Sequence, residues 1–210
     1  MRRLAAVVAV GVFVLAGPIH AIAITLSDVA DGWALSQNSF SSISGINSPS
    51  VDLLVERADP SEGRAALEFD ISGIPTGVTS ATLQLWIFLL ADADIAVHGA
   101  TGNGTIEASD FFFSNPLTTF DPTTFGPPTL NEVDVTAFIQ SSVGNQFVVF
   151  QLRELHNQEA NFIVSRTPDF VFSAFTPRLL ITVPEPASLV LLGAGLAGLA
   201  GIGWRRTRKK

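Results

Sequence analysis

The sequence predicts a mainly β protein, in which a single β-sandwich with jelly-roll-like topology is flanked by an N-terminal signal peptide and a C-terminal transmembrane helix. Three observations lead to this fold class. Apolar and polar residues alternate with a period of two in the middle of the chain, clusters of Gly, Pro, Asn and Ser separate these stretches, and both ends are apolar and basic. Many short strands with almost no helical pattern favour a sandwich over an α/β enzyme fold.

The clearest strand is the stretch RAALEFDI, where apolar and acidic residues alternate from Leu67 onward. The alternation predicts that Glu68 and Asp70 lie on a strand face that is exposed to water. The next strand, residues 78–90, alternates in the same way. Further strands are predicted at residues 51–56, 95–98, 147–152, 162–165, 170–172 and 179–183.

Two stretches depart from the strand pattern. Val135, Phe138 and Ile139 have the spacing of a short helix that ends at Gly144. Residues 100–130 are rich in Gly, Ser, Thr, Asn and Pro, and they predict a long surface excursion of the kind that often carries binding in small β domains.

The charge of the middle region limits its partners. Residues 24–183 contain five arginines, no lysine and eighteen acidic residues, a net charge of −13 with neutral histidines. Such a surface repels nucleic acids and anionic lipids, and it attracts divalent cations or basic partners. The chain has no cysteine, which excludes disulfides, thiol nucleophiles and Cys-ligated metals. About 160 residues is an ordinary size for one domain, so we expect residues 24–183 to form a single β-sandwich ectodomain.

The N-terminal end has the order of a secretory signal peptide over residues 1–23. Two arginines precede an apolar stretch, Gly17 and Pro18 break it, and the small residues Ala21 and Ala23 provide the cleavage region. Cleavage is predicted after Ala23 or Ala21. A retained N-terminal anchor is the alternative.

The C-terminal end predicts a transmembrane helix over residues 187–204, eighteen residues without charge. As a helix this run covers about 27 Å, close to the roughly 30 Å of a hydrocarbon core. A basic tail at 205–210 acts as a membrane stop and stays in the cytoplasm, which places the middle domain outside. Its charged residues are Arg205, Arg206, Arg208, Lys209 and Lys210. The preceding Pro184, Glu185 and Pro186 cannot continue a helix and hold the chain extended.

This order of a Pro-Glu-Pro triplet, an apolar helix and a basic end resembles the PEP-CTERM sorting signal of Gram-negative bacteria, here over residues 184–210. The resemblance implies an exosortase, a membrane protease that cuts near the triplet and releases or transfers the protein. It also implies export across the inner membrane to the cell envelope, the outer surface or the medium, in bacteria that make exopolysaccharide.

The middle region carries a second resemblance, to DNRLRE-type domains, which are β-sandwiches grouped with carbohydrate-binding modules. Three stretches carry it: ALEFDISGIPTGVTSATLQLW at 66–86, NEVDVTAFI at 131–139 and PRLLITV at 177–183. The resemblance covers most of residues 24–183 and implies a sandwich that could bind carbohydrate.

The sequence indicates no catalytic residue, because it lacks a nucleophile paired with a base and because its many acidic residues are predicted on wet faces or in turns. The candidates for sugar binding are Trp33 and Trp86, since sugars are recognised by exposed aromatic platforms. The two pairs of carboxylates that could provide oxygen ligands for a structural calcium are Asp28 with Asp31 and Asp92 with Asp94. No other cofactor is expected.

These observations predict an exported, exosortase-sorted protein of the cell surface or extracellular matrix that is not an enzyme. Its sandwich would serve structural or adhesive interaction or carbohydrate binding. The alternative is a secreted polysaccharide-degrading enzyme that uses a carboxylate pair. The expected partners are the secretion machinery and exosortase, the membrane before processing, and extracellular polysaccharide, but not nucleic acid.

Overall fold

The structure is a computed structural model of the chain, and it describes residues 21–37, 42–48, 53–58, 61–89, 94–121, 129–155, 160–164 and 176–185, together with Gly195. The chain divides into two compact units, one of which is the sandwich domain Ile22–Pro184. Most of the predicted signal peptide, the apolar run 187–204 except Gly195, and the basic tail lie outside the described residues. Within the described part of the chain, no helix is long and apolar enough to cross a membrane.

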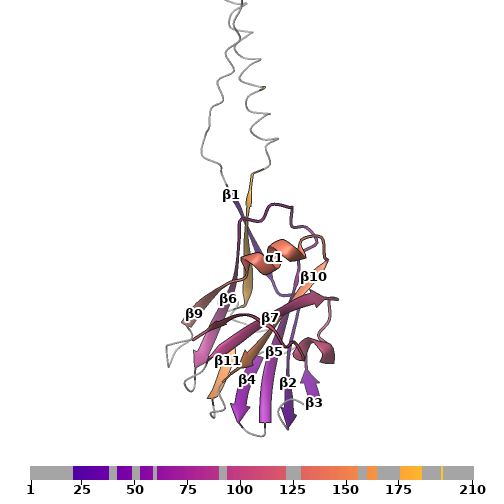
Figure 1. The fold of residues 1–210 in the computed structure, drawn as a ribbon, viewed down its shortest axis with the longest axis vertical. Coiled ribbons are helices and arrows are strands. Elements are labelled where there is room, and N and C mark those ends of the chain that lie inside the picture. The colour runs from indigo at the N-terminus through magenta and orange to yellow at the C-terminus, as the bar shows by residue number, and fades with distance from the viewer. Residues whose placement is uncertain are drawn as a thin grey trace, which may run out of the picture. The chain divides into compact units, whose positions relative to one another are not determined.

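The domain is built almost entirely of strands, which confirms the mainly β prediction (Figure 1). In chain order the elements are β1 (Ala21–Ser27), β2 (Ala30–Gln37), β3 (Ser42–Asn47), β4 (Leu53–Ala58), β5 (Ser61–Asp70), β6 (Ser80–Leu89), β7 (Ile95–Gly102), the 3-10 helix η1 (Ala108–Phe111), β8 (Pro116–Phe120), β9 (Thr129–Asp134), α1 (Thr136–Ser142), β10 (Phe147–Glu154), β11 (Ala160–Val164) and β12 (Arg178–Pro184).

The strands form two layers with antiparallel pairing (Figure 1). One layer has the order β3-β2-β5-β10-β7-β8 and the other has the order β1-β12-β6-β9. The two layers are joined by β4 and β11, because β11 pairs with β6 on one side and with β4 on the other, and β4 continues to β5. The hydrogen-bonding path is therefore continuous from one layer to the other.

The main core lies between the layers and is formed by the apolar stripes of both. Leu83 and Leu85 of β6 are fully buried, as the alternation of this strand predicts. Phe150 of β10 is the centre of an aromatic group, with edge-to-face contacts to Phe69 at 5.9 Å and to Phe138 at 5.4 Å between ring centroids. The helix that carries Phe138 is α1, and its position confirms the short helix predicted there.

The other face of β5 overturns one prediction. Glu68 is completely buried and does not lie on a face exposed to water. It belongs to a run from Glu62 to Phe69 in which every residue is buried. A segment from the predicted surface excursion covers this face, and we call residues 103–113 the cover segment. Its residues Ile106, Phe111 and Phe113 pack with Ala66 in a second apolar cluster.

Residues 100–130 are therefore not an open excursion in their described part. They contain the end of β7, η1, β8 and the first residues of β9. The strands β1, β2 and β3 were not predicted from the sequence either. The strand predicted at 170–172 lies outside the described residues.

Candidate functional site

The first functional feature is the end of β12, where the domain meets the Pro-Glu-Pro triplet. Val183 is buried in the main core, whereas Pro184, the last residue of the strand, is exposed. Glu185 is partly exposed and Pro186 lies outside the described residues. The carbonyl oxygen of Thr182 accepts hydrogen bonds from the Thr79 backbone N–H at 2.8 Å and from the Thr79 hydroxyl at 3.0 Å. The triplet therefore begins where the fold ends.

The predicted signal-cleavage residues lie in β1, which is the neighbour of β12. Ala21 and Ala23 are both exposed, and the burial pattern of β1 leaves most of its side chains in contact with solvent. The choice between the two cleavage positions stays a prediction.

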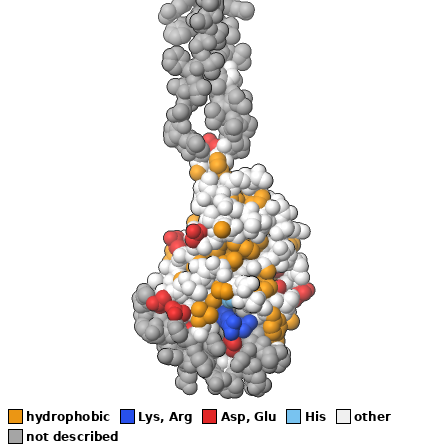
Figure 2. Space-filling view, in the orientation of Figure 1, with side chains coloured by type: hydrophobic (Ala, Val, Ile, Leu, Met, Phe, Trp, Pro, Cys, Tyr) orange, Lys and Arg blue, Asp and Glu red, His pale blue; other side chains and the backbone are white. Residues whose placement is uncertain are grey.

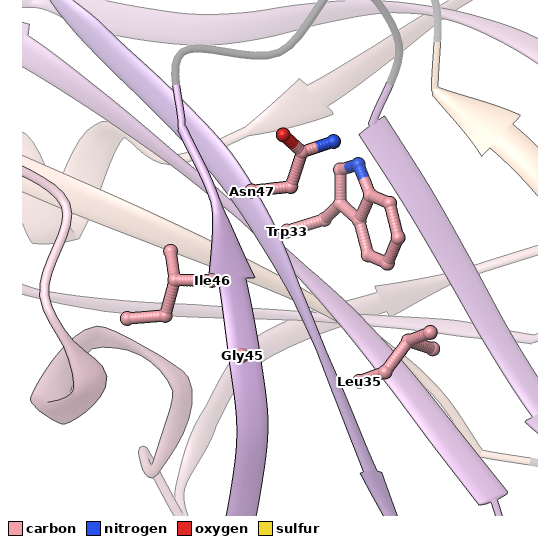
Figure 3. A pocket seen from close by; sticks show the side chains of 5 residues that line it. All are labelled: Trp33, Leu35, Gly45, Ile46 and Asn47. Atoms are coloured by element: carbon pink, nitrogen blue, oxygen red, sulfur yellow. The ribbon is translucent and has the colours of Figure 1, made fainter.

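The second feature is a pocket of about 250 Å³ at the β2–β3 edge (Figure 3). Trp33 and Leu35 come from β2, and Gly45, Ile46 and Asn47 come from β3. Figure 3 shows the Trp33 indole and the Asn47 amide on the same side of the two strands, while Ile46 points away. The register explains this arrangement, because Trp33 lies opposite Asn47 in the β2–β3 pair.

Trp33 is anchored at the edge of the main core, against which it packs while partly buried. A Cβ added to Gly45 would meet no atom within 4 Å, so the wall of the pocket is open beside this residue. The pocket combines a fixed aromatic face with an exposed amide.

The other candidate, Trp86, lies on the face of β6 that is turned away from the core and pairs with Leu130 of β9.

A further hollow of about 310 Å³ lies beside α1, lined by Thr76, Gly77, Val78, Gln140 and Val143. The Gln140 amide donates a hydrogen bond of 2.8 Å to the Val78 carbonyl, so its polar group is used by the fold. The Trp33 pocket is the better binding candidate of the two, because its lining includes an aromatic side chain and that of the hollow beside α1 does not.

The third feature is a set of buried polar side chains beneath the cover segment, which we call the polar face. The carboxylate oxygen Oε1 of Glu62 accepts hydrogen bonds from Arg64 Nε at 2.8 Å and from Arg153 Nε at 2.7 Å. Arg64 Nη1 also donates to the Phe111 carbonyl at 2.6 Å. The Gln151 amide bonds the same segment, since its oxygen accepts from the Phe113 N–H at 3.0 Å. These contacts fix the cover segment to the sheet.

Glu68 is on the same face as these residues. Its Oε1 accepts a hydrogen bond of 2.8 Å from the Gly104 N–H. Burial raises the pKa of Glu68, and the charges of Asp110 and Glu107 raise it further against the opposing backbone hydrogen bonds. Burial likewise raises the pKa of Asp110. Two buried carboxyls with raised pKa therefore lie on and under the cover segment.

The sequence does not predict this polar face. His98 is a further member of it. His98 lies opposite Gln151 in the β7–β10 pair and is only 2 % exposed. Burial lowers the pKa of its imidazole, and the positive charges of Arg153 and Arg64 lower it further. The neutral ring is thus the form that this site favours.

The calcium hypothesis stays a prediction. Asp28 and Asp31 are both buried, Asp94 is partly buried and Asp92 lies outside the described residues. Among the side chains that the structure describes, no group of three or more His, Cys, Asp or Glu residues could hold a metal ion.

Comparison with known proteins identifies the tail. A family model described as the PEP-CTERM protein-sorting motif matches residues 182–209. These residues are a PEP-CTERM sorting signal. The signal implies processing by an exosortase and export to the cell envelope or surface. No curated protein matches the chain. The family match covers the tail and only the last three residues of the sandwich domain, so the resemblance of the sandwich to DNRLRE-type domains remains a prediction.

Proposed function

We propose that this is an exosortase-sorted protein of the cell surface or extracellular matrix whose sandwich domain binds carbohydrate and has no catalytic activity. The sorting motif at 182–209 supports the destination. The observation that carries the binding function is the pocket in which Trp33 and Asn47 face the same space.

The chemistry of this pocket suits a sugar. An indole ring offers an apolar face for the C–H groups of a pyranose ring, and an amide can both donate to and accept from hydroxyl groups. The pocket volume of about 250 Å³ is below the range of pockets for drug-sized ligands, which fits one sugar unit of a longer chain. The face of the domain in Figure 2 is mostly uncharged, with one small basic area and separate acidic areas.

The alternative proposal is a polysaccharide-degrading enzyme that uses a carboxylate pair. Its strongest candidates are Glu68 and Asp110, because raised pKa values are typical of general acids. However, Glu68 is completely buried and its Oε1 is bonded to the cover segment. A substrate could reach this pair only if the cover segment opened, so we favour binding without turnover.

Sorting is tested by intact mass and fractionation of the protein in its own host, beside a variant with Pro184, Glu185 and Pro186 replaced by alanine. We expect the native protein to lose its tail and the variant to keep it. If native protein in the envelope fraction retains Lys210, the proposal of exosortase processing is wrong.

Binding is tested with purified exopolysaccharide of the host, by affinity electrophoresis or calorimetry. Trp33→Ala should weaken binding more than about tenfold, as expected for an aromatic at the centre of a contact, and Asn47→Ala should weaken it less. Trp86→Ala is the matched control and should bind normally. Thermal unfolding of each variant separates lost contacts from lost fold, because Trp33 also packs on the core.

The same samples distinguish the enzyme. Polysaccharide chain length is measured before and after incubation with native protein and with Glu68→Gln. Shortening by native protein that disappears in Glu68→Gln would favour the enzyme over the binding module. Binding by Trp86→Ala as weak as that by Trp33→Ala would reject the pocket.

A further inference from the structure

The sorting motif and the folded domain share residues. The matched motif begins at Thr182, whereas β12 continues to Pro184. The first residues of the motif are therefore part of a strand that pairs with β6 and with β1. Figure 1 shows β12 running beside β6 along the domain to the end where β1 begins.

The fold holds this part of the motif by both its backbone and its side chains. Thr182 pairs with Ser80, and its carbonyl accepts the two hydrogen bonds from Thr79. Val183 is 2 % exposed and belongs to the main core. By contrast, Pro184 is exposed and has no backbone N–H to give to a sheet. The boundary between residues held by the fold and exposed residues thus falls between Val183 and Pro184.

We propose that the folded sandwich sets the N-terminal limit of the exosortase cut, so that Pro184 is the first residue the protease can engage. This inference rests on the proposed sorting function. Proteases bind their substrates as extended chains whose backbone groups are free to pair with the enzyme, and folded strands must open before they can be cut. Residues up to Val183 are not available in this form while β12 is in the sheet.

One consequence concerns the rate of the cut. In the sequence, the triplet follows Val183, a buried residue of the main core, without a linker. A protease cleft that binds extended chain on the N-terminal side of its cut then needs residues that β12 holds in the sheet. The fold therefore slows processing as well as limiting its position.

The first experiment follows the full chain in its host by pulse-labelling and intact mass. The native mature protein should end at Pro184 or later. A short flexible Gly-Ser spacer between Val183 and Pro184 should make tail loss severalfold faster. The matched control carries the same spacer between Ser72 and Gly73, in an exposed turn, and should be processed at the native rate.

The second experiment needs no exosortase. Arg178 is exposed on β12, but the following Leu179 is completely buried opposite Leu83 of β6. Trypsin should not cut the native full chain after Arg178. It should cut there in Leu83→Asp, where the sheet that holds β12 is destabilised, and this cut shows that the sequence itself is a substrate.

The outcomes separate the two proposals. A native mature protein that ends at Val183 or earlier, or a native chain that trypsin cuts after Arg178, overturns the limit set by the fold and leaves sorting intact. An unchanged rate with the spacer overturns the effect on rate. Retention of Lys210 in both the native and the spacer chains overturns the proposed sorting function, and the limit on its cut falls with it.

Discussion

The packing of Gly102 against Glu68 gives the sharpest test of the closed polar face. A Cβ added to Gly102 would overlap Glu68 Oε1 and would lie 2.7 Å from Glu68 Cδ. Glu68 has no exposed surface and its Oε1 is bonded to the Gly104 N–H, so a movement of its carboxylate away from the new methyl group breaks this hydrogen bond. Gly102→Ala must therefore displace either the strand or the hydrogen bond.

The cost of this substitution follows from these two contacts. Overpacking a closed site by a methyl group costs about 1–3 kcal/mol, and the lost hydrogen bond adds about 1 kcal/mol. We expect Gly102→Ala to lower the free energy of unfolding by about 2–4 kcal/mol. In a domain of this size that lowers Tm by roughly 5–15 °C. Urea and thermal unfolding of the purified protein measure both quantities.

Two controls make the test specific. Gly45→Ala, on a strand of the same layer, adds a Cβ that meets nothing within 4 Å and should change stability by less than about 0.5 kcal/mol. In a Glu68→Ala background, Gly102→Ala should lose most of its cost, because the atoms it would overlap are gone. If Gly102→Ala is neutral, or equally harmful with and without Glu68, then the carboxylate is not seated against Gly102 and the argument for a closed face is wrong.

Two further predictions concern the same face. The raised pKa means that the folded chain binds the Glu68 proton more tightly than the unfolded chain does. The contribution of this group to stability is therefore greatest below about pH 4.5, the ordinary pKa of a Glu carboxyl. It is lost as the pH rises through the raised pKa, so Glu68→Gln should flatten the decline of the urea midpoint at pH values above about 4.5. An unchanged decline would contradict this cause. Phe111→Ala should cost about 3–5 kcal/mol because Phe111 is fully buried, whereas Phe112→Ala, at a residue 46 % exposed, should cost less than about 1 kcal/mol. Equal losses of Tm in the two variants would show that the cover segment is not fixed through Phe111.

The parts of the fold that the sequence predicts are those with a strong local pattern. In β6, four alternating apolar residues define the buried stripe without reference to any other element. The helix α1 is equally local, since apolar spacing starts it and Gly144, with a φ of +104°, follows its end. By contrast, β2 and β3 contain many small and polar residues, so their period-two signal is weak. The strand β1 does alternate, with Ile22, Ile24 and Leu26 on one face, but its first residues overlap the predicted signal peptide.

The burial of Glu68 could not be predicted, because it depends on a segment more than thirty residues away in the sequence. A strand with acidic residues on one face looks the same whether water or another segment covers that face. The cover segment has local hydrogen bonds of its own, such as the one from the Glu107 N–H to Asp110 Oδ2 at 2.7 Å, but its attachment to the sheet depends on Arg64 and Gln151, which are distant in the sequence. Trp33 was a candidate on residue type alone, whereas its partner Asn47 came only from the β2–β3 register.

The positions of the two functional features suggest how they work together. Figure 1 places β3, which carries Asn47, at the end of the domain opposite the one where β12 ends. The polar face is occupied by its own hydrogen bonds to the cover segment, whereas the pocket at the β2–β3 edge brings an indole and an exposed amide to the same side of two strands. A domain held or delivered through its C-terminal end would then present this pocket away from that end. Since no residue of the pocket contributes to β12, Trp33→Ala should leave the exosortase cut unchanged and the triplet-to-alanine variant should still bind polysaccharide. If either variant lost both functions, the pocket and the end of β12 would have to be coupled through the core. Sorting and binding would then not be separate functions of this protein.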